Sequence, residues 1–309
     1  MSPPPAAGPD APRPRPARGP RQRTAGREEL ARHARFTELS PELGVLDEDA
    51  LDDALAEDAD ATLTLLVEMG RATDERLRAR ARALAARVVL DRARAGLPRR
   101  SGPGRLRRQP ADRGGDLDLD ASLEAVAGAR ARREAATDLV AVDWARPPLA
   151  LCLLVDASGS MGGERLAAAA LTAAACALRA PGDHAVLAFA RDVTVLRGMG
   201  AARPPGAVVD DVLGLRGHGV TSLSAALRGA ADQLARSRAP RRVAVLLSDC
   251  RATDDQDPTT AAAARPELVV LSPADDSDAA QDLARRSGAR WRPLTGAAAA
   301  PALLRDLLA

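Results

Sequence analysis

The chain has 309 residues, of which 46% are hydrophobic, 28% are charged and only 1% are aromatic, and its formal net charge at pH 7 is +2. The length suits one large domain and a smaller one, and the scarcity of aromatic side chains predicts an aliphatic core. So small a net charge argues against a nucleic-acid partner, and three widely spaced cysteines argue against a disulfide framework or a zinc site.

Residues 1–28 are rich in Pro, Arg and Gly and contain almost nothing to bury, which predicts a disordered tail. This segment lacks the apolar stretch of a secretory signal, and no later segment has about 18 consecutive apolar residues. We therefore expect a cytoplasmic protein that does not interact with the membrane.

Residues 29–97 have a helical pattern and are expected to form a small all-α bundle. Ser40 is the expected N-cap of one helix, with Pro41 at its first position. Gly70 and Gly96 stand where helices are expected to end, because glycine tolerates the left-handed cap conformation. The last helix of this region is amphipathic and therefore needs a packing partner.

Residues 98–115 are rich in Pro, Gly and Arg and are expected to form a linker. Residues 116–147 follow with an acidic opening, a helix over about 121–134 and an alternating strand around 139–142. We expect this segment to extend the domain that comes after it.

The acidic opening contains Asp116, Asp118 and Asp120, a spacing that invites comparison with a calcium-binding loop. Such a loop requires Gly at its sixth position and Glu at its twelfth, where this chain has Ala121 and Ala127. Acidic residues also favour a helix N-terminus, where they complement the helix dipole, and this is the interpretation we adopt.

Residues 148–309 alternate between apolar strands and helices. The expected strands are 149–155, 185–190, 193–197, 242–248 and 267–272, and the expected helices are 165–179, 207–213, 223–237, 258–264, 277–287 and 300–308. This alternation predicts an α/β fold, with a doubly wound, mostly parallel, Rossmann-like sheet covered by helices on both faces.

Polar residues stand where the loops of such a sheet converge, at the carboxyl ends of its strands. Asp156, Ser158 and Ser160 follow the first buried strand, Asp249 follows the strand 242–248, and Thr221 lies in the loop before a long helix. All five are oxygen donors, which Mg²⁺ prefers, and we expect Mg²⁺, with Mn²⁺ as the alternative. Capping of loops and helices would explain each residue singly but not the whole set.

The string Asp156-Ala-Ser158-Gly-Ser160 after a hydrophobic strand, with Thr221 in GVTSL and Asp249 in LLSDC, resembles the metal-ion-dependent adhesion site of von Willebrand factor type A (VWA) domains. The resemblance implies the VWA, or integrin I-like, fold over residues 148–309. It also implies that the two serines and the threonine ligate the metal directly, while the aspartates act directly or through water. One position of the metal would stay open for an acidic residue of a partner protein.

Five further residues are expected to form the partner-binding rim of this site: Gly159, Met161, His218, Ser222 and Cys250. Two of them depart from the commonest family pattern. Ser222 replaces an acidic residue that often follows the threonine, and Cys250 replaces a glycine after the final aspartate. Both departures leave the five ligand types intact.

The segments GDLDLDASLE, RPPLALCLLVDASGSMGG, LRGHGVTSL and VLLSDCRAT together resemble bacterial CoxE-like VWA proteins that are associated with MoxR-type AAA+ ATPases. This resemblance implies a non-catalytic adaptor or co-chaperone that works with such an ATPase in metalloenzyme maturation or complex remodelling. A metal-dependent hydrolase is the alternative, with Asp254, Asp255 or Asp257 as candidate bases. A subunit like chelatase D is a further alternative, although the chain has no P-loop GxxxxGK[ST].

Overall fold

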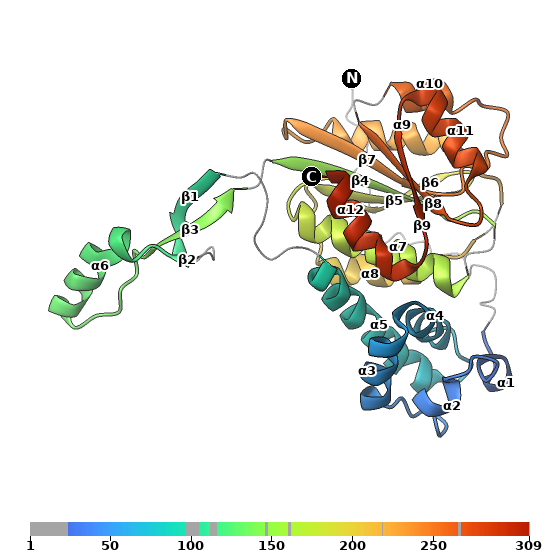
Figure 1. The fold of residues 1–309 in the computed structure, drawn as a ribbon, viewed down its shortest axis with the longest axis horizontal. Helices are drawn as coiled ribbons and strands as arrows, with labels where there is room; N and C mark the ends of the chain where they lie inside the picture. The colour runs from blue at the N-terminus through green and yellow to red at the C-terminus, as the bar shows by residue number, and fades with distance from the viewer. Residues whose placement is uncertain are drawn as a thin grey trace, which may run out of the picture.

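The computed structural model describes residues 24–96, 105–111, 116–145, 148–159, 162–217, 219–264 and 267–308. Figure 1 shows a body, formed by residues 24–96 and 148–308, and a small arm, formed by residues 105–145. Most of the expected tail, residues 1–23, lies outside the described residues. Within that expected tail Ala25 is already ordered, because its N–H donates to Arg71 O at 2.9 Å.

The body is built on a six-stranded sheet with the strand order β6-β5-β4-β7-β8-β9. Its strands are β4 (Leu149–Asp156), β5 (His184–Phe189), β6 (Val193–Arg197), β7 (Arg241–Leu247), β8 (Leu268–Pro273) and β9 (Arg290–Leu294). All neighbours run parallel except β5 and β6, which are antiparallel. The predicted α/β, mostly parallel fold is confirmed, with β9 as a strand that the sequence pattern did not reveal.

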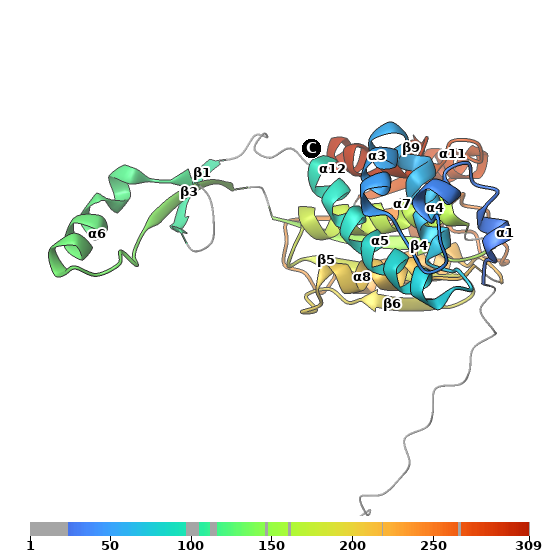
Figure 2. The same cartoon turned by 90° about the horizontal axis from the view of Figure 1, so that it is seen from below.

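Helices cover both faces of the sheet, with one set above it and the other below it in Figure 1, and Figure 2 views the molecule from the side of the lower set. One face carries α7 (Gly163–Arg179), α8 (Pro205–Leu213) and α12 (Ala300–Leu308), and the other carries α9 (Leu223–Leu234), α10 (Thr259–Ala263) and α11 (Asp278–Ser287). Because side chains alternate along a strand, Leu151 and Leu153 of β4 join the core on the α7 side, while Cys152 and Leu154 join the core on the α9 side. A strand buried on both faces explains the unbroken apolar run.

The N-terminal helices pack directly on the α7 face. They are α1 (Arg27–Leu30), α2 (Phe36–Leu39), α3 (Glu48–Glu57), α4 (Ala59–Met69) and α5 (Glu75–Gly96). Helices α4 and α5 contact α7, and a single hydrophobic cluster runs from Leu30 to Leu308. The Ala-rich α7 is therefore buried between the sheet and the N-terminal helices, where small side chains permit close approach from both sides. The helices expected as a bundle share the core of the sheet.

The start of α3 differs from the expectation. Ser40 is the C-cap of α2, and its hydroxyl donates to Glu42 O instead of accepting from a helical N–H. The helix begins later, where the Asp47 side chain accepts hydrogen bonds from the backbone N–H groups of Asp49 and Ala50. Gly70 does end α4, but with φ −61° it adopts the right-handed conformation instead of the left-handed one.

The arm consists of β1 (Arg105–Pro110), β2 (Asp116–Leu117), α6 (Leu119–Arg132) and β3 (Val140–Ala145). Its strands form a separate antiparallel sheet in the order β1-β3-β2, so residues 98–115 are not purely a linker and residues 116–147 do not extend the body's sheet. The acidic opening does cap a helix, because the Asp118 side chain accepts from Ala121 N. Among the described helices, none is long and apolar enough to cross a membrane.

Candidate metal centre

Strand pairing brings the predicted site residues to one edge of the sheet. Val155 of β4 pairs with Leu247 of β7, so Asp156 and Ser248 both stand at the carboxyl ends of neighbouring parallel strands. The Asp156 loop is held to β5 by a hydrogen bond from Ala157 N to Phe189 O at 2.7 Å. The edge is thus built by three adjacent strands of the sheet, β5, β4 and β7.

The Thr221 loop is attached to the same edge. Ser222 N donates to Ala190 O, directly after β5, at 2.9 Å. Thr221 N donates to Thr253 Oγ1 at 2.7 Å, and Thr253 N donates to Thr221 O at 3.1 Å. These bonds join the Thr221 loop to the segment that follows Asp249, so the loops that carry Asp156, Thr221 and Asp249 are tied to one another.

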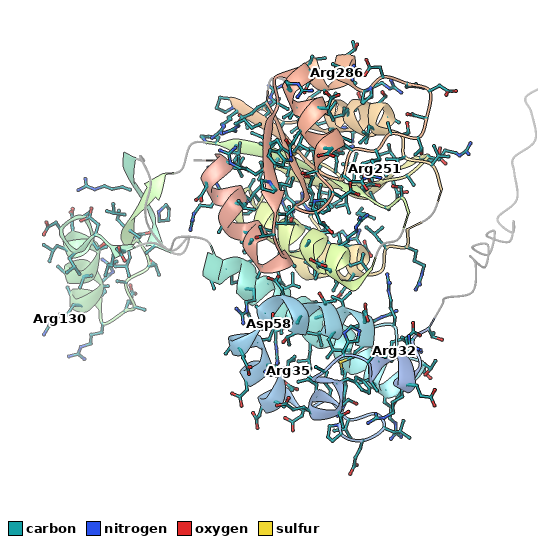
Figure 3. All side chains as sticks on the ribbon, turned by 45° about the vertical axis from the view of Figure 1, so that its right-hand side comes forward. Arg32, Arg35, Asp58, Arg130, Arg251 and Arg286 are labelled. Atoms are coloured by element: carbon teal, nitrogen blue, oxygen red, sulfur yellow. The ribbon has the colours of Figure 1, made fainter. Side chains whose placement is uncertain are left out.

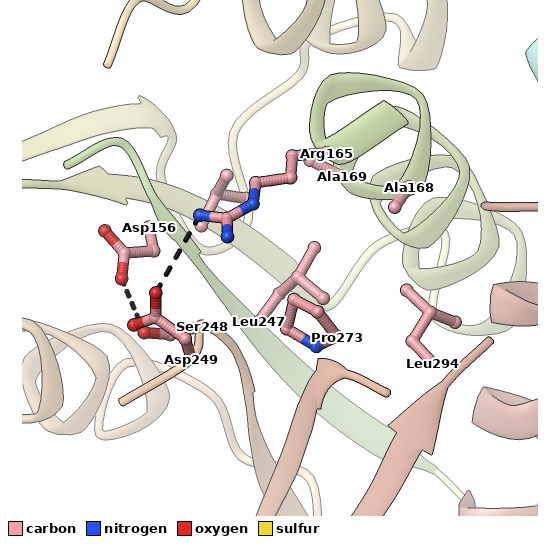
Figure 4. Close-up of a pocket in the computed structure, with 10 residues that line it drawn as sticks. Asp156, Arg165, Ala168, Ala169, Leu247, Ser248, Asp249, Pro273 and Leu294 are labelled. Carbon is pink, nitrogen blue, oxygen red and sulfur yellow. Dashed lines mark hydrogen bonds and ion pairs between the residues drawn. The ribbon is translucent and has the colours of Figure 1, made fainter. Parts of the chain in front are cut away.

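The Asp156 carboxylate is fully engaged on both oxygens. Its Oδ1 accepts from Ser158 N at 2.9 Å and from Ser158 Oγ at 2.5 Å, and its Oδ2 accepts from Ser248 Oγ (Figure 4). Burial raises the pKa of Asp156, and the nearby charge of Asp249 raises it further, while the bonds from Ser158 and Ser248 act in the opposite direction. A cation at this position would favour the charged carboxylate.

The Asp249 carboxylate lies between a backbone N–H and a cationic side chain. Its Oδ1 accepts from Arg251 N at 3.0 Å, and its Oδ2 lies 3.8 Å from Nη1 of Arg165, which reaches over from the first turn of α7 (Figure 4). Neither Arg165 nor Ser248 was expected at the site from the sequence. Ser248 could have been found as a polar residue at a strand end, directly before Asp249, whereas the contact of Arg165 depends on the tertiary position of α7.

The structure describes some of the predicted site residues, and others lie outside the described part of the chain. Thr221 is buried beside Thr253, and Gly159 is exposed at φ +59°, a conformation that favours glycine. Ser160, Met161 and His218 lie outside the described residues.

Ser222, one of the two departures from the family pattern, is buried and bonded to an acidic residue from another loop. Its hydroxyl donates to Asp254 Oδ2 at 2.6 Å, so Asp254 supplies a carboxylate next to Ser222. The other oxygen, Asp254 Oδ1, is buried without a hydrogen-bond partner among the described residues. Such an unpaired oxygen is costly, and a cation or water at the loops would satisfy it.

Cys250, the second departure, adopts a backbone conformation with φ +63°, where glycine is normally favoured. Its N–H donates to Ser248 Oγ at 2.9 Å, and its side chain is buried. Burial, followed by the charges of Asp249 and Asp156, raises the pKa of the thiol well above its usual range. The thiol therefore stays protonated and unreactive at neutral pH.

The donors at this edge fit a hard divalent cation. Asp156, Ser158, Thr221 and Asp249 offer only oxygen atoms, which Mg²⁺ and Mn²⁺ prefer. In the described part of the chain, no group of three or more His, Cys, Asp and Glu side chains could hold a metal ion. A metal here would therefore depend on the hydroxyl groups as well as on the two carboxylates.

A cavity of about 50 Å³ adjoins these carboxylates beneath α7 (Figure 4). Asp156, Ser248, Asp249 and Arg165 form its polar end. The rest of its lining is apolar and consists of Val155, Ala168, Ala169, Leu247, Pro273 and Leu294.

Comparison with known families gives one match that covers more than half of the chain. A family described as "VWA domain containing CoxE-like protein" matches residues 81–282. The matched region begins within α5, includes the arm and the loops of the candidate metal centre, and ends within α11. The comparison with curated proteins gave no match.

Several solved structures resemble the body at low sequence identity. An aerotolerance-related membrane protein from Bacteroides fragilis NCTC 9343 has a TM-score of 0.43 and 15% identity, over 52% of this chain and 98% of that one. The manganese-loaded TRAP protein of Plasmodium vivax has a TM-score of 0.44 and 20% identity, over 53% of this chain and 74% of that one. A von Willebrand factor type A protein from Catenulispora acidiphila has a TM-score of 0.42 and 17% identity, over 54% and 43% of the two chains.

Proposed function

The chain belongs to the family of VWA domain containing CoxE-like proteins, and on that premise we propose that it is a non-catalytic adaptor that binds a partner protein through a divalent metal ion. The observation that carries this proposal is the convergence of Asp156, Thr221 and Asp249 at one edge of the sheet, through loops that are hydrogen-bonded to one another.

The five ligands of the proposed site divide into charged and neutral groups. Asp156 and Asp249 supply negative charge, and Ser158, Ser160 and Thr221 supply neutral hydroxyls. When bound there, Mg²⁺ or Mn²⁺ with one open position would accept an Asp or Glu carboxylate of a partner. Several neutral ligands favour this, because they leave positive charge for the incoming carboxylate to neutralise.

The rim of the site would select the partner. Gly159 is exposed beside Asp156, and Ser222 and Cys250 lie buried beneath the loops, so the two buried residues shape the rim without forming its surface. From the family relationship we propose a MoxR-type AAA+ ATPase as the partner and the cytoplasm as the location. The complex would act in metalloenzyme maturation or in the remodelling of another protein complex.

A pull-down with and without a chelator tests this proposal. We expect the chain to recover a MoxR-type ATPase of the same organism in Mg²⁺ and to lose it in EDTA or after Asp249→Asn. Asp52→Asn, which changes an exposed carboxylate of α3, is the matched control and should leave recovery unchanged. Equal recovery of the ATPase with Mg²⁺ and with EDTA would overturn the proposal.

A metal-dependent hydrolase remains the alternative function. Of its candidate bases, Asp257 accepts hydrogen bonds from Thr259 and pairs with Arg286, and these contacts lower its pKa. Asp254 and Asp255 are then the remaining candidates. Hydrolysis that is lost in Asp255→Ala while partner binding is unchanged would favour this alternative.

A further inference from the structure

Helix α6 carries a stripe of exposed apolar side chains beside the side that packs on β3. Leu119, Leu123 and Val126 are separated by four and three residues, so they lie on one side of the helix, and their exposed fractions are 69%, 62% and 44%. Leu117, just before the helix, is 45% exposed. Among the described residues, six large hydrophobic side chains are exposed, and these four lie within ten residues of one another.

The arm does not use this stripe for its own core. The side of α6 that faces β3 is lined by small residues, with Ser122 and Ala129 buried. Ser122 anchors the helix, because its Oγ accepts from Val140 N at 3.0 Å. The larger apolar side chains lie beside this buried side and remain exposed to solvent. Figure 1 shows α6 at the end of the arm, away from the body.

The charges beside the stripe are separated along the helix. Asp120 and Glu124 are exposed on the N-terminal half of α6, and Arg130 and Arg133 are exposed at its C-terminal end. Figure 3 shows the Arg130 side chain extending from the arm into solvent. Asp120 and Arg130 are too far apart on one helix to contact each other. They are complementary to a second copy of α6 that runs in the opposite direction.

We propose that two copies of this chain associate through α6, packed antiparallel. Leu123 of one copy then faces Val126 of the other, and Leu119 and Asp120 lie along Arg130. Each apolar stripe shields the other from water. The acidic half of each α6 lies against the basic half of α6 in the other copy. The antiparallel arrangement also places the two helix dipoles favourably.

Charge reversal tests this arrangement on the full chain. Sedimentation velocity of the wild type should show a mass of twice 32.1 kDa that dissociates on dilution. Asp120→Arg and Arg130→Asp should each weaken self-association on the order of ten-fold, because each places like charges together in both symmetry-related contacts. The double variant, which carries both changes, should recover wild-type association. A wild type that stays monomeric, or a double variant as weak as the single ones, would overturn the proposal.

Substitutions in the apolar stripe provide an independent measurement. Leu123→Asp should give a monomer, while Leu43→Asp changes an even more exposed leucine, outside the arm, and should leave association unchanged. Circular dichroism checks that both variants keep the wild-type helix content. Equal effects of the two substitutions would contradict a specific role of α6.

Cross-linking tests the direction of packing. A mixture of Leu119→Cys and Arg130→Cys chains should form a mixed disulfide faster than Leu119→Cys chains form one with each other. The native cysteines do not interfere, because Cys152, Cys176 and Cys250 are buried. Faster cross-linking between two Leu119→Cys chains would show parallel packing and overturn the antiparallel arrangement.

Discussion

The guanidinium of Arg165 lies 3.8 Å from Asp249 Oδ2, so an internal cation stands beside one of the two carboxylates of the proposed metal site. Both side chains are partly exposed, at 43% and 18%, and the attraction between them is therefore modest. Its position still matters, because the positive charge of Arg165 opposes the binding of a metal cation at the adjacent site.

We predict that Arg165→Ala strengthens Mn²⁺ binding several-fold, since about 1 kcal/mol of charge repulsion corresponds to that change. Titration calorimetry of the purified chain measures it. Arg305→Ala is the matched control, because Arg305 is 42% exposed and pairs with Asp306 on α12. Weaker Mn²⁺ binding in Arg165→Ala would show that the arginine supports the site instead of opposing the metal.

A second prediction concerns the strained backbone at Cys250. Cys250→Gly should be more stable than Cys250→Ala by about 1 kcal/mol, because a side chain with φ +63° costs free energy that glycine avoids. Both variants lose the buried thiol and differ only by the Cβ methyl group, whose burial stabilises the Ala variant, so the measured difference is a lower limit on the backbone effect. Urea unfolding gives the two free energies. Equal stabilities would mean that the loop relaxes when the side chain is shortened.

The contact between the N-terminal helices and α7 gives a third prediction. A Cβ added at Gly163 would lie 2.8 Å from Glu68 Cγ and 2.9 Å from Thr64 O, both on α4. Gly163→Ala should therefore lower the free energy of unfolding by about 1 to 3 kcal/mol. Gly162→Ala is the control, since a Cβ there meets nothing within 4 Å. Thermal unfolding that gives the two variants the same midpoint would contradict tight packing of α4 on α7.

A fourth prediction concerns pH. His184 is buried, its Nδ1 lies 2.8 Å from Ala180 O, and its Nε2 has no partner among the described residues. Burial, aided by the charge of Arg197, lowers the pKa of His184 to about 4. The unfolded chain takes up a proton near the ordinary value of about 6.5, whereas the folded chain does so only near 4. The contribution of neutral His184 to the free energy of unfolding is therefore fully present above pH 6.5. It is lost as the pH falls from 6.5 to about 4, and the loss is roughly 3 kcal/mol.

The variant His184→Gln removes this titration. Urea unfolding at several pH values should give a difference between wild type and variant that shrinks as the pH falls through that window. Other groups contribute to both proteins equally, so the difference isolates His184. A stability difference that is independent of pH would show that the pKa of His184 is the same in the folded and the unfolded chain.

Much of the sheet follows from the sequence, because parallel strands buried on both faces must be apolar throughout. Leu149–Asp156 has this pattern and is the central strand β4. The position of the candidate site follows from the same topology, since Asp156 and Asp249 come directly after neighbouring parallel strands. Strand β9 does not show the pattern, because Arg290–Leu294 alternates charged residues with Trp291 and includes Pro293. A strand with such a composition is favoured at the edge of a sheet, where β9 lies.

The contacts missed by the sequence analysis depend on segments far apart in the chain. Arg165 reaches Asp249 only because α7 packs over the ends of β4 and β7, and Asp254 reaches Ser222 only because two loops meet. Strand β1 is equally hidden, since Arg105–Pro110 is rich in arginine and forms a strand only by pairing with β3. Local patterns give no information on such pairings.

The shared core of α4, α5 and α7 has a consequence for synthesis on the ribosome. Translation completes α5 at Gly96, and its packing partner α7 begins only at Gly163, after the whole arm has been made. During that interval the side of α5 that packs on α7 remains uncovered. The nascent N-terminal half therefore cannot complete its core, and a fragment that stops before α7 exposes a surface prone to aggregation.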